Sequence, residues 1–138
     1  MSPSTATELT PVVKLVTHED MDAFESVVWN RGPNVHNDPA TAKAFGVSAP
    51  FASGMMQLAY VHEFMEKNFS DGWTVGGKVS ARWTRLVYSD DVLTVEGTVT
   101  GIENGRATVD IKCTRGADGA TTAVATATAL VGRSGDER

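Results

Sequence analysis

A polar loop that carries a histidine, followed by a glycine at the start of an apolar helix, holds the groups best suited to chemistry. The loop runs from Asn30 to Asn37 and contains His36, and the segment from Pro50 to Met56 contains Gly54. Histidine transfers protons near neutral pH. Backbone N–H groups at the start of a helix bind oxygen that carries negative charge. These are two of the parts needed for proton transfer beside a carbonyl group, and the third, an acid to pair with His36, is not evident in the loop.

The neighbours of His36 offer binding groups instead of that acid. Asn30 and Asn34 can hold a water molecule or a substrate, but an amide does not donate or accept a full proton. Arg31 adds a positive charge, which would favour neutral His36 or bind a substrate carboxylate. Asp38 could act as the acid, but it precedes a proline and is better explained as the N-cap of a short helix.

The hydrophobic pattern predicts the elements that position these groups. Residues 53–68 form the longest helical candidate, whose first half is apolar nearly all round and should be buried. Asn104-Gly105 predicts a type I′ hairpin turn, and Asp118-Gly119 predicts a second hairpin turn. Further helices are expected over 18–29 and 38–44, and strands over 12–16, 73–88, 92–101, 106–115 and 123–131.

This order of elements predicts an α+β fold with a single hot-dog domain, in which an antiparallel sheet is wrapped around a long central helix. We expect the domain to span 11–131, with flexible tails over 1–10 and 132–138. Such a sheet has exposed edges, and pairing with a second copy or a homologous subunit would cover them. A homodimer or a hot-dog heterodimer is therefore expected.

Composition limits the partners and the compartment. The formal net charge of −5 disfavours a nucleic-acid partner. No apolar run is long enough to cross a membrane, and the first residues do not resemble a signal peptide. The only cysteine, Cys113, fits a reducing cytoplasm. Three scattered histidines and one cysteine lack the spacing of metal ligands, so neither a metal nor a cofactor is expected.

The order and spacing of three segments resemble the MaoC-like (R)-specific enoyl-CoA hydratases. These segments are Pro33–Pro39, Pro50–Met56 and Val79–Val95. The family's loop reads approximately Asp-x-Asn-Pro-hydrophobic-His-x-Asp, and its helix start reads Ala-His-Gly-Met. The resemblance implies that the Gly54 N–H holds a thioester carbonyl, while a histidine and an aspartate add water across an α,β double bond.

The sequence departs from the family pattern at several positions. The catalytic aspartate five residues before the histidine is replaced by Arg31. Pro33 and Asn34 stand in reversed order, and the histidine of the helix-start motif is Ser53. His36, Asp38 and Gly54 therefore match the pattern, but the acid does not. By resemblance the substrate would be a thioester of coenzyme A or of an acyl carrier protein, or a related carbonyl compound.

The leading interpretation is a hydratase or dehydratase lyase, or a relative that catalyses another addition, elimination or cyclisation. The expected catalytic residues are His36, Asn30 and Arg31, and the expected substrate-binding residues are Asn34, Ser53, Gly54 and Met55. The missing aspartate supports an alternative, namely a non-catalytic hot-dog subunit that pairs with a catalytic homologue. A thioesterase is a third interpretation, but the carboxylates of Glu63 and Glu66 lie two to three turns beyond Gly54, too far from the helix start.

Overall fold

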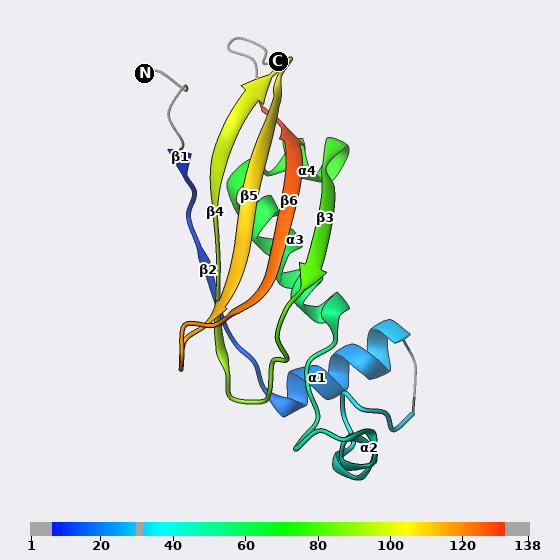
Figure 1. The fold of residues 1–138 in the computed structure, drawn as a ribbon. Coiled ribbons are helices and arrows are strands. Elements are labelled where there is room, and N and C mark those ends of the chain that lie inside the picture. Colours follow the sequence, from blue (N-terminus) through cyan, green and yellow to red (C-terminus); the bar gives the residue numbers. More distant parts are fainter. Residues whose placement is uncertain (1–6, 30–31, 132–138) are drawn as a thin grey trace.

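The computed structural model describes residues 7–29 and 32–131, which form one antiparallel sheet packed on a long helix (Figure 1). The helix α3 lies along one face of the sheet, and α1 and α2 lie beyond one end of it. The strands are β1 (Thr7–Glu8), β2 (Val12–Leu15), β3 (Lys78–Trp83), β4 (Val92–Glu103), β5 (Arg106–Arg115) and β6 (Thr121–Leu130). The helices are α1 (His18–Phe24) with its π-helical extension η1 (Glu25–Trp29), α2 (Pro39–Phe45), α3 (Gly54–Phe69) and α4 (Asp71–Gly76).

The sheet has the order β1-β4-β5-β6-β3, and β2 also pairs with β4. Every pairing is antiparallel. Asn104 and Gly105 connect β4 and β5 with φ angles of 55° and 75°, as a type I′ turn requires. Gly119, with φ of 72°, lies between β5 and β6. Both predicted hairpins are therefore confirmed.

The core lies between α3 and the inner face of the sheet. Phe64 and Met65 of α3 are fully buried, as are Leu93 and Val109 of the facing strands. The alternation predicted for β5 is also confirmed, because every second residue from Ala107 to Cys113 is buried. A sheet wrapped on a buried helix is the predicted hot-dog fold.

The prediction of one continuous strand over 73–88 is wrong at both ends. Residues 71–76 form α4 instead, which packs against the end of β6. Gly72 permits this packing because a Cβ there would collide with the carbonyl group of Leu130. After Trp83 the chain leaves the sheet, and Arg115 Nη1 holds it by donating to the carbonyl oxygen of Leu86 at 2.7 Å. The apolar residues of this run thus pack through tertiary contacts that strand periodicity does not reveal.

The N-terminal tail prediction also needs correction. Thr7 and Glu8 form β1 against Val99 and Thr98 of β4. Leu9 packs against the core. The rest of the predicted tails, 1–6 and 132–138, lies outside the described residues.

The helices begin and end close to the predicted positions, because local capping determines their ends. Ser53 caps α3, and Asp38 caps α2, which ends at Gly46 with φ of 108°. The prediction that α3 is buried all round in its first half is wrong for Met55, which is 44% exposed, whereas Met56 and Tyr60 are buried.

Candidate active site

The loop that carries His36 is held together by its own asparagine side chains. Asn34 Oδ1 accepts a hydrogen bond from the backbone N–H of His36 at 2.8 Å, and Asn34 Nδ2 donates to the carbonyl of Gly32. Asn37 Oδ1 accepts from the backbone N–H of Asn34 at 2.8 Å. The Asn34 side chain therefore shapes the loop, and its expected contact with substrate stays a prediction.

The His36 ring is fixed in position by the segment that precedes α3. Nδ1 lies 2.8 Å from the carbonyl oxygen of Phe51, and the two rings meet edge to face with centroids 4.8 Å apart. A carbonyl oxygen only accepts hydrogen bonds, so Nδ1 carries the proton in the neutral ring and Nε2 carries the lone pair. The ring is partly buried. His36 thus has the tautomer that a general base requires at Nε2.

The first turn of α3 has backbone N–H groups to offer. Ser53 is buried and its Oγ accepts from the N–H of Met56 at 3.1 Å, so the serine acts as the N-cap. Within the described part of the chain, no hydrogen bond uses the N–H groups of Gly54 and Met55. A helix start with uncommitted N–H groups favours an oxygen with negative charge. The binding roles expected for Ser53, Gly54 and Met55 stay predictions.

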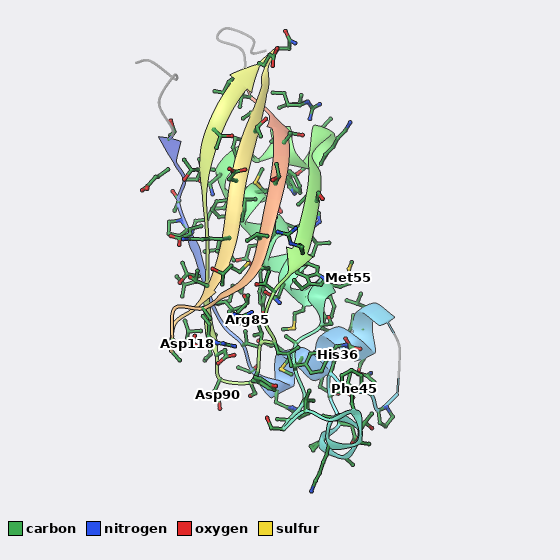
Figure 2. The ribbon with its side chains drawn as sticks, viewed as in Figure 1. His36, Phe45, Met55, Arg85, Asp90 and Asp118 are labelled. Atoms are coloured by element: carbon green, nitrogen blue, oxygen red, sulfur yellow. The ribbon has the colours of Figure 1, made fainter. Side chains whose placement is uncertain are left out.

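The contact between His36 and Phe51 brings the loop close to this helix start. Phe51 lies three residues before Gly54, and three residues span at most about 10 Å. In Figure 2 the labelled His36 and Met55 both lie at the end of the sheet where α3 begins. The structure therefore ties the His36 loop to the segment that leads into the helix start, and the expected reach of His36 toward the Gly54 N–H stays a prediction.

Trp83 closes one side of Gly54. A methyl group added to Gly54 would lie 2.6 Å from Cε2 and 2.8 Å from Cδ1 of the indole ring. Only glycine fits there without a shift of the ring. Trp83 ends β3 and is 41% exposed. Sequence reasoning missed its role, because the only signal was an aromatic residue between the exposed Arg82 and Arg85.

The acid that would pair with His36 is not identified at the predicted positions. Asn30 and Arg31 lie outside the described residues. Asp38 Oδ2 accepts from the hydroxyl and the backbone N–H of Thr41, at 2.6 and 2.9 Å. These hydrogen bonds, first from the hydroxyl and then from the backbone, lower the pKa of Asp38. Asp38 is therefore the N-cap that the sequence favoured, and it is a poor proton donor.

Sequence reasoning missed a buried carboxylate in the helix that precedes the loop. Glu25, only 1% exposed, begins η1. Asp22, one turn earlier, accepts a hydrogen bond from Asn37 Nδ2 at 3.2 Å and so joins α1 to the His36 loop. π-helical turns often occur at functional sites. A polar residue at an apolar helical position was the available signal.

Other polar residues serve elsewhere. His62 is exposed and its Nδ1 accepts from Trp73 Nε1 at 3.3 Å. In the described ranges, no group of three His, Cys, Asp or Glu side chains is arranged to hold a metal ion. No helix within those ranges is long and apolar enough to cross a membrane.

Comparisons with known proteins agree with this architecture. The family model described as "MaoC like domain" matches residues 5–121. No curated protein matches the sequence significantly. A chain of the ChsH1-ChsH2 complex from Mycobacterium tuberculosis is similar, with a TM-score of 0.80, 16% identity and coverage of 94% of this chain and 99% of that one.

Two further solved structures are similar. The (R)-hydratase from A. caviae involved in PHA biosynthesis gives a TM-score of 0.75 at 18% identity, covering 95% of this chain and 97% of that one. The MaoC-like dehydratase from Rhodospirillum rubrum gives 0.71 at 20% identity, covering 97% and 94%. At these identities the structural likeness establishes the fold alone.

Proposed function

Because the chain belongs to the family of proteins with a MaoC-like domain, we propose that it is a hydratase or dehydratase lyase acting on an α,β-unsaturated acyl thioester or a related carbonyl compound. One observation carries the proposal. The hydrogen bond from His36 Nδ1 to the Phe51 carbonyl leaves Nε2 with a lone pair and ties the histidine to the segment that leads into the helix start at Gly54.

In the proposed hydration, Nε2 of His36 takes a proton from water while the water oxygen forms a bond to the β-carbon. The electron pair of the double bond moves toward the thioester oxygen, where the Gly54 N–H stabilises the negative charge. The α-carbon then takes up a proton, which His36 can return. Dehydration follows the same steps in reverse. Removing one oxyanion donor typically costs about 10²–10³ in turnover.

The other predicted residues have supporting roles in this proposal. Asn34 fixes the backbone beside His36, and Ser53 fixes the helix start that carries Gly54. Asn30 would orient water or substrate, and Arg31 would hold an acidic group. Exposed Met55 would contact the substrate at the helix start. The carrier would be coenzyme A or an acyl carrier protein, whose phosphates the exposed Arg82 or Arg85 could meet. A cytoplasmic location stays a prediction.

The proposal is tested by an assay of crotonyl-CoA hydration, in which the decrease in absorbance of the enoyl thioester measures the rate. His36→Ala should lower turnover by about 10²–10⁴, the usual contribution of a positioned acid or base. His18→Ala is the matched control, because His18 is exposed at the start of α1. Full activity in the His36 variant would show that the loop is not catalytic.

The alternative is a non-catalytic subunit that pairs with a catalytic homologue. It is favoured by Arg31 at the position of the family's acid. The edge of the sheet favours a dimer of either kind, since β3 pairs only with β6 among the described strands. We expect a homodimer or a heterodimer, and light scattering distinguishes either from a monomer. If the protein is a hydratase that has lost the family's aspartate, Arg31→Asp should restore that carboxylate and raise the rate of crotonyl-CoA hydration. If Arg31 instead binds an acidic substrate, the same substitution should abolish the native reaction.

A further inference from the structure

Two of the buried polar side chains of this protein lie at the first turn of α3. The buried polar residues of the described chain are Glu25, Ser53, Gln57 and Thr122. Ser53 caps the helix, and Gln57 and Thr122 contact each other. Gln57 is 2% exposed and Thr122 is fully buried. A polar pair in an otherwise apolar core needs a reason, because burying an amide without its hydrogen bonds is unfavourable.

A β-bulge at the start of β6 builds this pair. Cys113 pairs with Ala123, but Thr114 pairs with Thr121, so Thr122 is an extra residue on its strand. As a result Thr122 and Ala123 are both buried, which regular alternation would forbid. The bulge thus turns the Thr122 hydroxyl inward, where Oγ1 lies 2.9 Å from Gln57 Oε1.

The same bulge adjoins the proposed site. The carbonyl oxygen of Thr122 accepts from the N–H of Thr84 at 2.9 Å, directly after the Trp83 ring that covers Gly54. Gln57 follows Gly54 by three residues, so both lie on one face of α3, about 4.5 Å apart along its axis. Gln57 therefore stands one turn deeper than the proposed oxyanion donor.

The oxygen of the Gln57 side-chain amide accepts a hydrogen bond, whereas its nitrogen has no acceptor among the described residues. The Thr122 hydroxyl donates to Oε1, which directs Nε2 away from Thr122. In the part of the chain that the structure describes, Nε2 donates no hydrogen bond, yet it is not among the polar atoms sealed from solvent. Nε2 is therefore a donor held in one orientation, with a small accessible area.

We propose that Gln57 is a specificity-determining residue, whose Nε2 donates a hydrogen bond to an oxygen on the acyl chain beyond the thioester carbonyl. This inference rests on the proposed function and narrows its substrate class to acyl thioesters that carry a hydroxyl or carbonyl oxygen on the chain. A plain alkyl chain would leave the amide unpaired, and sites built to hydrogen-bond a substrate discriminate against analogues that lack the partner.

Binding of two saturated thioesters, pentanoyl-CoA and 4-oxopentanoyl-CoA, tests the inference by calorimetry without requiring turnover. The wild-type protein should bind the thioester with the chain carbonyl about tenfold more tightly or better. Gln57→Leu should abolish that preference by weakening the binding of the 4-oxo thioester alone. Equal affinities in the wild-type protein, or an equal loss for both thioesters in the variant, would overturn the inference.

A second pair of variants keeps the test valid if Gln57→Leu does not fold. Thr122→Val removes the hydroxyl that orients the amide and should reduce the preference, whereas Thr122→Ser keeps the hydroxyl and should retain it. An unchanged preference in Thr122→Val would contradict the proposed orientation. If neither thioester binds the wild-type protein, the proposed function fails together with the inference, while equal binding of both overturns the inference alone.

Discussion

Replacing Gly54 by alanine has two opposing effects on the free energy of unfolding. In an unstrained helix, alanine is more stable than glycine by up to about 1 kcal/mol. At this position the new methyl would lie 2.6 Å from Trp83 Cε2, where ordinary contacts begin at 3.4 Å. Nε1 of the same ring would lie closer still, so the ring must retreat by at least 3.4 − 2.6 = 0.8 Å. Overpacking typically costs about 1–3 kcal/mol.

We expect overpacking to outweigh helix propensity, with a net loss of about 1–2 kcal/mol and a fall in Tm of about 3–6 °C. Thermal unfolding followed by circular dichroism measures it. Gly101→Ala is the matched control, because no atom lies within 4 Å of the position of its new methyl. Displacing the ring beside the proposed oxyanion donor should also lower crotonyl-CoA hydration.

A double-mutant cycle shows whether contact with Trp83 causes the loss of stability in Gly54→Ala. In a Trp83→Ala background, Gly54→Ala should be neutral or stabilising, which corresponds to a coupling of about 1–2 kcal/mol. A higher Tm for the single Gly54 variant would refute the reasoning, because it would mean that the indole moves aside without cost. Equal effects of Gly54→Ala with and without Trp83 would refute it as well.

Two further predictions concern buried groups. Burial raises the pKa of the Cys113 thiol to about 12, so the native thiol should resist alkylation at pH 8 and react after unfolding in urea. An unfolded thiol has a pKa of about 8.5, so above that pH the unfolded state loses its proton before the folded state does. The free energy of unfolding should therefore fall by up to about 1.4 kcal/mol per pH unit until the folded thiol ionises. A Cys113→Ala variant whose free energy of unfolding falls equally steeply with pH would contradict this. Ser53→Ala removes the cap of α3 and should lower the free energy of unfolding in urea by about 1 kcal/mol. Ser53→Thr keeps the hydroxyl and should retain most of that stability, and equal losses in the two variants would show that the hydroxyl is not the cap.

The sequence by itself determined the local features of this protein. Ser53 and Asp38 cap helices, and Asn104-Gly105 takes positive φ angles, because each depends on hydrogen bonds or sterics within a few residues. Alternation in β5 indicated its buried face for the same reason. The hot-dog fold followed, since these elements have few ways to bury one apolar helix against one sheet.

Only the tertiary structure decided how the site is built. The carbonyl that sets the tautomer of His36 belongs to Phe51, 15 residues away, and Thr122 reaches Gln57 across 65 residues. Trp83 determines that residue 54 must be glycine. Such contacts depend on the register of the strands and on one extra residue in β6. Either feature moves a side chain from one face of the sheet to the other, and neither is visible in the local sequence pattern. The sequence indicated which residues could take part in chemistry, but only the folded structure showed which groups they contact.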